Sequence, residues 1–248
     1  MISLIWLRDV LVDWLLIVVA IVIGLNFWYL IPLSIFIIGN RQHALAILGH
    51  DATHKLVSKN NRINYMFGNF LCYAPLGLPW EGYRKFHMSH HRWLGTVNDP
   101  ELDRKITSGM VVKNATRKNI ILQFIKDLLG LNVLGIRKFT IKGTYLDQAA
   151  IELTHMLIIL TVFIDWRIPF MWYVSMVTSL LACSRLRIWH EHVGTMKTHK
   201  IKSNWWQRLL FLPHAAEYHH EHHEKPSIPY NKLKDIATGP RKKVSEIH

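Results

Sequence analysis

Residues 14–39 read WLLIVVAIVIGLNFWYLIPLSIFIIG, and this uninterrupted apolar run decides the class of fold. It is the centre of an apolar block from Val10 to Leu48. About 20 helical residues cross a bilayer, so the block is long enough for two helices back to back. Residues 24–26, Gly-Leu-Asn, are the predicted turn. The first two predicted spans are therefore residues 10–25 and 27–48.

A second apolar block runs from Gln148 to Ile188 and is interrupted at residues 165–169, which read DWRIP. The interruption divides it into predicted spans at residues 148–164 and 168–188. The sequence thus predicts an all-α integral membrane protein, a single domain over residues 1–248 with about four transmembrane helices.

The charge of the chain is unevenly distributed. The net charge is +13, and 28 of the 30 Lys and Arg residues lie between Arg41 and Lys142 or from Arg185 onward. Four crossings place both basic segments on one side, which the positive-inside rule assigns to the cytoplasm. We therefore predict a multi-pass protein with cytoplasmic termini and a cytoplasmic helical cap at residues 50–147 and 189–248. No nucleic-acid-binding motif accompanies the charge, so nucleic acid is not an expected partner.

Three further segments have weaker patterns. Residues 62–80 are apolar but interrupted by Gly and Pro, and residues 118–134 are amphipathic, so both are expected to lie at the membrane surface. Residues 239–243, Gly-Pro-Arg-Lys-Lys, are expected to form a frayed, lipid-facing end.

Eight histidines recur in three clusters with helical spacing. Residues three and four apart share one face of a helix, so each cluster can direct its rings at one point. Eight imidazoles are too many for one metal ion and suit two, and they are compatible with Zn, Cu, Ni or Fe. All three clusters fall on the predicted cytoplasmic side, where they can form one dimetal site. The predicted ligands are His50, His54, His87, His90, His91, His219, His222 and His223.

Around these clusters the sequence resembles the integral-membrane fatty acid desaturase superfamily. Residues 50–54 (HDATH), 78–102 (LPWEGYRKFHMSHHRWLGTVNDPEL) and 213–233 (PHAAEYHHEHHEKPSIPYNKL) are similar to its three histidine boxes. The separation of 33 positions from His54 to His87 favours this family over the related membrane hydroxylases. The resemblance implies a centre of two non-haem Fe ions, dioxygen as co-substrate and electrons from a separate redox protein.

The resemblance also implies a ninth histidine ligand, in the segment RLRIWHEHVGT at residues 185–195. The Glu-His pair of the family motif corresponds to Glu191-His192, so His192 is the expected ligand, with His190 as the alternative. His190 and His214 are otherwise candidates for a supporting role beside the ligands.

Several other polar residues have an expected place. Asp51 and Glu221 lie within the first and third boxes, where each could accept the outer N–H of a ligand histidine or could be a solvated surface acid. His155 falls in the third span, where it lines a substrate tunnel or is a packed neutral histidine. His43 has no partner at helical spacing and is expected on the surface.

The expected function is O2-dependent oxidation of a C–H bond in a long hydrophobic chain, such as a fatty acyl chain, with desaturation as the expected outcome. Zinc is redox-inert and cannot serve this chemistry. The expected electron donor is ferredoxin, rubredoxin or cytochrome b5 with its reductase. The alternatives are a hydroxylase or carotenoid-type ketolase with the same centre and, more distantly, a divalent metal transporter. A transporter would place its ligands near the bilayer midplane, unlike these clusters.

Overall fold

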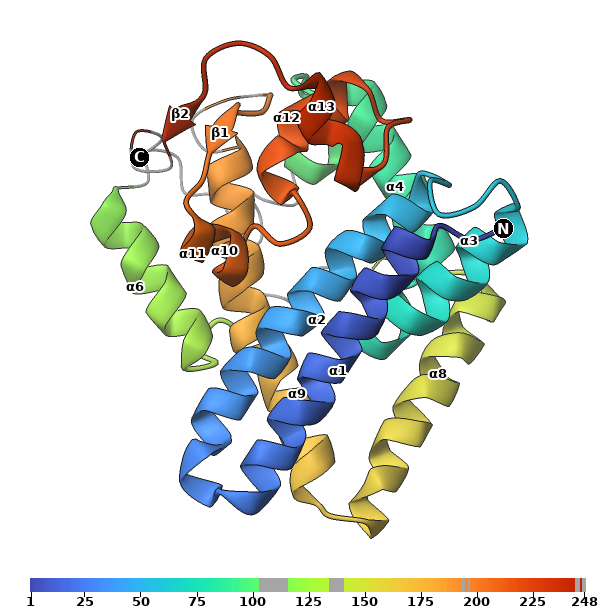
Figure 1. The fold of residues 1–248 in the computed structure, drawn as a ribbon, viewed down its shortest axis with the longest axis vertical. Coiled ribbons are helices and arrows are strands. Elements are labelled where there is room, and N and C mark those ends of the chain that lie inside the picture. Colours follow the sequence, from blue (N-terminus) through green and yellow to red (C-terminus); the bar gives the residue numbers. More distant parts are fainter. Residues whose placement is uncertain (103–115, 134–140, 193–194, 196, 244–245, 247–248) are drawn as a thin grey trace. The chain divides into compact units, whose positions relative to one another are not determined.

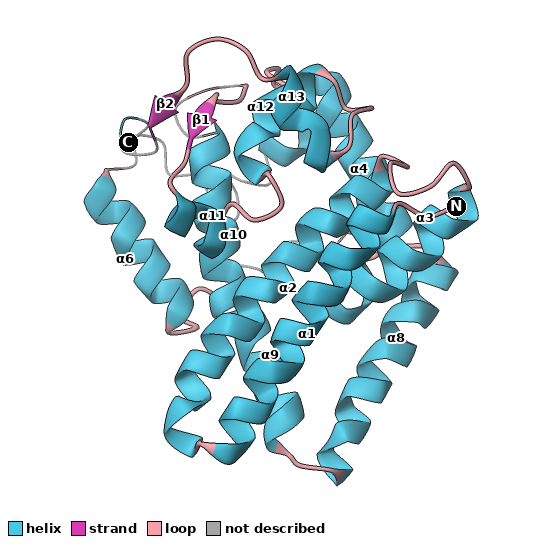
Figure 2. Ribbon diagram, in the orientation of Figure 1, coloured by secondary structure: helices cyan, strands magenta, loops and turns pink. Residues whose placement is uncertain are grey.

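The computed structural model describes residues 1–102, 116–133, 141–192, 195, 197–243 and 246, and its regular structure is almost wholly helical (Figures 1 and 2). The chain forms two compact units. Unit 1 consists of Met1–Tyr83 and Ile141–Leu181, and unit 2 of Arg84–Thr140 and Ala182–His248. The all-α prediction is confirmed for the described residues.

Unit 1 contains the long apolar helices. They are α1 (Leu4–Asn26), α2 (Ile31–Thr53), which the short η1 (Trp28–Leu30) precedes, and α8 (Tyr145–Leu160), which η4 (Thr161–Phe163) follows. Within the described residues, three helical stretches are long and apolar enough to cross a membrane, and they coincide with the first three predicted spans. These stretches are Leu4–Asn26, Trp28–Thr53 and Tyr145–Phe163.

The turn between α1 and α2 lies slightly later than predicted. Helix α1 continues through Asn26, and the backbone leaves the helical conformation at Phe27 (φ −130°, ψ 87°). Pro32 then occupies the first turn of α2, where a missing N–H leaves no hydrogen bond unmade. Gly24 serves close packing rather than the turn, because a Cβ there would lie 2.7 Å from the sulfur of Met171.

Helix α2 packs against α1 and α9 and extends beyond the predicted span (Figure 1). It runs without a break to Thr53, so the first histidine box is its last turn. Polar residues are buried along it, including Arg41, which forms an ion pair of 3.0 Å with Asp13 of α1. His43 is only 1% exposed, so the expectation that it lies on the surface is wrong.

The fourth predicted span is not one helix. Helix α9 (Arg167–Val177) ends at Thr178, whose backbone angles are φ −122° and ψ −87°, and α10 (Ser179–His192) begins directly after it. Eleven residues give a helix of about 16 Å, too short to cross the hydrocarbon core alone.

The predicted broken segment at residues 62–80 is indeed a series of short helical pieces. These are α3 (Asn61–Gly68), η2 (Asn69–Tyr73) and η3 (Ala74–Leu76). The side chain of Asn60 accepts a hydrogen bond from the backbone N–H of Arg62 and so begins α3.

Helices α4 (Trp80–Trp93) and α10 each contribute residues to both units, and their C-terminal parts lie in unit 2. Unit 2 also contains α6 (Arg117–Leu128), which a buried ion pair between Asp127 and Arg185 connects to α10. Helix α6 thus covers the first part of the amphipathic segment predicted at residues 118–134 and ends at Leu128. Other short helices in the described part of unit 2 are α11 (Trp205–Leu210), η5 (Ala216–Tyr218), α12 (His219–Glu224), η6 (Tyr230–Lys232) and α13 (Leu233–Ile236).

The C-terminal segment is paired with the rest of unit 2. Strands β1 (Ile201–Lys202) and β2 (Lys242–Lys243) form a two-stranded parallel sheet in which Ile201 lies opposite Lys242. The expectation of a frayed end at residues 239–243 is therefore wrong.

Candidate metal centre

The second histidine box occupies the C-terminal half of α4. His87, His90 and His91 stand three and four positions apart, so their rings project from one side of the helix. The Nε2 atoms of His87 and His91 are 2.9 Å apart. All three histidines belong to unit 2.

The third box forms the six-residue helix α12. A tight turn leads into it, with positive φ at both His214 (49°) and Ala215 (58°). His219 and His223, one helical turn apart, bring their Nε2 atoms to 2.9 Å. Helix α12 thus repeats the arrangement that His87 and His91 make on α4.

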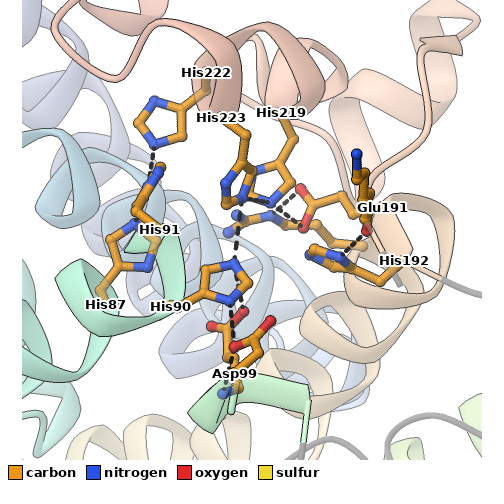
Figure 3. Close-up of polar contacts among 12 residues, drawn as sticks. His87, His90, His91, Asp99, Glu191, His192, His219, His222 and His223 are labelled. Carbon is orange, nitrogen blue, oxygen red and sulfur yellow. Dashed lines mark hydrogen bonds and ion pairs between the residues drawn. The ribbon is translucent and has the colours of Figure 1, made fainter. Parts of the chain in front are cut away.

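The two boxes interleave to give two groups of imidazoles (Figure 3). In group A the ligand nitrogens of His87, His91 and His222 lie within 4.8 Å of one another. Group B has the same spread of ligand nitrogens and consists of His90, His192, His219 and His223. Each box contributes to both groups, since the Nε2 atom of His222 is 3.1 Å from that of His91 and the Nε2 atom of His223 is 3.3 Å from that of His90. Two groups of this size suit two metal ions.

His190 and His192 have different surroundings. His192 belongs to group B, and its Nδ1 atom lies 2.9 Å from the carbonyl oxygen of Lys197, which leaves Nε2 for a ligand role. His190 contacts the carbonyl of Leu186 in its own helix through Nδ1, and its ring stacks on Phe211 at 4.8 Å between centroids. The structure thus brings His192, and not His190, into a group with the box histidines.

Burial favours the neutral form of three of these imidazoles. It lowers the pKa of His91 to about 4, with neighbouring His90 adding to the effect. Burial also lowers the pKa of His219 and of His223, and the surrounding histidines lower each pKa further. Metal ions bind the neutral ring, so the low pKa values favour ligation.

Three acids lie beside group B, in contacts that no sequence pattern predicted: Asp99, Glu101, whose Oε2 lies 3.3 Å from Nε2 of His90, and Glu191. Asp99 is 3% exposed, and its Oδ1 lies 2.7 Å from Nδ1 of His90. Glu191 accepts a hydrogen bond of 2.7 Å from Arg187, and its other oxygen lies 3.7 Å from Nε2 of His219. The Asp-Pro pair at residues 99–100 was visible only as part of the family resemblance, and nothing in the sequence paired it with His90.

The other predicted residues lie as follows. Glu221, inside the third box, pairs with Arg241 in the described part of the chain, not with a ligand histidine. His214 packs edge-on against Tyr230 at 5.8 Å. In unit 1, Nδ1 of His155 lies 2.9 Å from the hydroxyl of Tyr173.

The first box lies in unit 1. His50 is in the last turn of α2 and His54 follows as its C-cap, with the two ring centroids 4.9 Å apart. Asp51 between them is buried. The rings of His50 and His54 therefore lie together, as their spacing predicts. Their role as ligands stays a prediction.

Comparison with known proteins places these boxes in a family. The model of the fatty acid desaturase family matches residues 26–245. The chain is 26% identical to dihydrorhizobitoxine desaturase of Bradyrhizobium elkanii, over 82% of this chain and 65% of that protein. It is 28% identical to sphingolipid delta(4)-desaturase/C4-monooxygenase DES2 of Rattus norvegicus, over 83% of this chain and 64% of that protein.

A third relative matches a shorter region. The sn-1 acyl-lipid omega-3 desaturase (ferredoxin) of Nostoc is 33% identical over 38% of this chain and 25% of its own length. The matched regions thus span less than two thirds of the length of each of these relatives. The family model, in contrast, covers most of the chain and contains all three histidine boxes. The chain therefore belongs to the fatty acid desaturase family.

Proposed function

We propose that this chain is an O2-dependent di-iron oxidoreductase that desaturates a long hydrophobic chain. The observation that carries the proposal is the convergence of seven buried or half-buried imidazoles of unit 2 into groups A and B. Such a donor set fits redox-active metals of the first transition series. Family membership favours iron among them.

The proposed ligands are nine histidines. Seven are the members of groups A and B, and His50 and His54 are added on the spacing of the first box and on the family resemblance. When bound, iron would supply the activation of O2 that oxidation of an unactivated C–H bond requires. The full list is His50, His54, His87, His90, His91, His192, His219, His222 and His223.

The protein itself supplies orientation and charge. Asp99 fixes the ring of His90 through its outer nitrogen, and the Lys197 carbonyl does the same for His192. The buried carboxylate of Glu191, near His219, reduces the positive charge of an all-imidazole site. These contacts hold the nitrogens of group B in place before metal binds.

A lipid substrate and a separate electron donor complete the proposal. Desaturation removes two hydrogens from adjacent carbons and, with O2, two electrons and two protons, yields two waters. The Nostoc relative is an acyl-lipid desaturase whose name specifies ferredoxin. The net charge of +13 would attract an acidic carrier such as ferredoxin, rubredoxin or cytochrome b5.

We propose a multi-pass membrane topology with both termini in the cytoplasm. The three long apolar stretches would each cross once. The fourth crossing would be made by α9 together with the start of α10. Helix α9 has only 11 residues and ends at Thr178, so it is too short to cross alone. Four crossings keep all three boxes on one side.

A second candidate is hydroxylation by the same centre, as in a hydroxylase or carotenoid-type ketolase. The specific observation in its favour is the rat relative, which is named both a desaturase and a C4-monooxygenase. Removal of a second hydrogen and addition of oxygen are alternative outcomes of breaking one C–H bond.

Product and metal analysis test the proposal together. The full chain is expressed with and without a His91→Ala change, and the lipids of both hosts are compared by mass spectrometry. A product lighter by two hydrogens supports desaturation, and one heavier by an oxygen supports hydroxylation. The purified protein is expected to contain about two irons per chain, since two groups suit two ions. One zinc and no iron would exclude the redox function.

A further inference from the structure

Helix α12 has two faces with different partners. His219, His222 and His223 point into groups A and B (Figure 3). Glu221 stands two positions, about 200°, from both His219 and His223, so it projects from the back of the helix. It is nevertheless 1% exposed, so its carboxylate needs a partner within the protein.

That partner is Arg241 of the C-terminal segment. Its Nη2 donates to the carboxylate of Glu221, and its Nη1 donates to the carbonyl oxygens of Ile201 (2.6 Å) and Glu217 (3.3 Å). The guanidinium carbon also lies 4.5 Å from the ring centre of Tyr218. One planar side chain thus contacts the helix, the residues before it and strand β1, a geometry that suits Arg better than Lys.

The backbone brings Arg241 to this position. Gly239 has a positive φ of 79°, which favours glycine, and three residues later the chain enters β2. The N–H of Lys242 donates to the carbonyl of Lys200 at 2.9 Å, and β2 pairs with β1. The contact between Arg241 and Glu221 therefore rests on a structured segment.

A helix of six residues needs such support. Helix formation is unfavourable until several turns have formed, so α12 has no appreciable stability of its own. Three of its six residues are proposed metal ligands. The direction of their rings therefore depends on the contacts that hold the back of the helix.

We propose that Arg241 is a positioning residue for the metal centre, which orients the histidines of α12 through its ion pair with Glu221. The inference rests on the proposed function, because it requires that His219, His222 and His223 hold metal. Glu221 then supports the ligands from behind, through an arginine, and not by accepting the outer N–H of a ligand ring.

The test compares three single variants of the full chain, purified in detergent with iron. Arg241→Gln removes both the positive charge and the planar guanidinium with its several N–H donors. Arg241→Lys keeps the positive charge but not the guanidinium. Lys242→Gln makes the same charge change at the next residue, which is exposed. The measurements are iron content, the rate at which a chelator removes iron, and the melting temperature of the metal-free protein.

Arg241→Gln is expected to weaken iron binding by about 10- to 100-fold, the effect typical of groups that orient ligands. Arg241→Lys should recover part of this loss, and Lys242→Gln should behave as the wild type. If Arg241→Gln fails to fold, Arg241→Lys decides the question. Iron release from Arg241→Lys at the wild-type rate would then overturn the inference.

A double-mutant cycle checks that the effect passes through Glu221. In a Glu221→Gln background, Arg241→Gln should cause little further loss of iron, because the pair is already broken. Fully additive losses would overturn the inference, as would wild-type iron release from Arg241→Gln. If the wild type itself binds no iron, the proposed function fails as well. If the wild type binds iron and Arg241→Gln binds it equally well, only the role of Arg241 is refuted.

Discussion

At the scale of the residue, the two nitrogens of His90 and of His192 have different surroundings. In group B the outer nitrogen of His90 is held by Asp99, and that of His192 by a backbone carbonyl. A partner on Nδ1 fixes the tautomer and leaves Nε2 available to a metal ion. The partners of the outer nitrogens therefore decide where the inner nitrogens point.

Asp99→Asn should weaken metal binding at group B. An amide keeps the shape of the side chain but removes the negative charge that orients the ring of His90. We expect affinity or activity to fall by about 10- to 100-fold, measured by chelator competition. Glu224→Gln is the control, since the side chain of Glu224 is 57% exposed and contacts His220, outside both groups. Equal affinities in the two variants would argue against a role for Asp99.

His192→Ala and His190→Ala should differ in iron content. His192 offers a nitrogen to group B, so its loss should lower the iron bound per chain. His190 packs on Phe211, so His190→Ala should mainly reduce stability and leave the iron in place. Elemental analysis of both variants distinguishes them, and the opposite pattern would reverse the assignment of the ninth ligand.

Part of this site could be predicted from the sequence because it is local. Histidines three and four apart must share a helix face, and the structure brings seven of the predicted ligands into two groups. The acids beside them could not be predicted, because contacts such as that of Asp99 with His90 depend on how a loop folds back. His43 shows the same limit. It is buried, but a single histidine with no partner at helical spacing forms no sequence pattern from which burial could be predicted.

At the scale of the element, a buried ion pair connects α6 to α10. Arg185 donates to both carboxylate oxygens of Asp127, which also accepts a hydrogen bond of 2.8 Å from Asn132. Asp127 is fully buried and Arg185 nearly so. Either charge would be costly to leave alone in this position.

Asp127→Asn should therefore lower the free energy of unfolding by about 3–5 kcal/mol, the usual cost of removing one partner of a buried pair. Denaturant titration in detergent measures the effect. The control is Arg8→Gln, which breaks an exposed pair with Asp9 and should change stability little. A double change of Asp127→Leu with Arg185→Met should be less harmful than Asp127→Asn alone. If the double variant is the less stable, desolvation does not explain the effect.

Element boundaries could be predicted only where the sequence marks them. The helix break at residues 165–169 contains proline and was predicted, whereas the break at Thr178 has neither glycine nor proline and was not. Likewise, the C-terminal segment has the composition of a free end. Its pairing with β1 depends on a strand about 40 residues earlier in the chain, which no local pattern reveals.

At the scale of the whole molecule, the distribution of charge and the number of crossings are linked. Nearly all Lys and Arg lie outside the apolar blocks, and three apolar helical stretches occur in the described residues. If α8 crosses the membrane, residues before and after it lie on opposite sides. The proposed cytoplasmic site requires further that the basic segment before α8 lie inside.

Cysteine labelling in intact cells tests this arrangement. Lys118→Cys, before α8, and Trp166→Cys, after it, both occupy exposed positions, whereas the native Cys72 and Cys183 are buried. A membrane-impermeant maleimide should label Trp166→Cys in intact cells and Lys118→Cys only after permeabilisation. Labelling of both from outside would mean that α8 does not cross. Labelling of Lys118→Cys alone from outside would reverse the orientation and place the second box away from the cytoplasm, because no predicted span lies between His91 and Lys118.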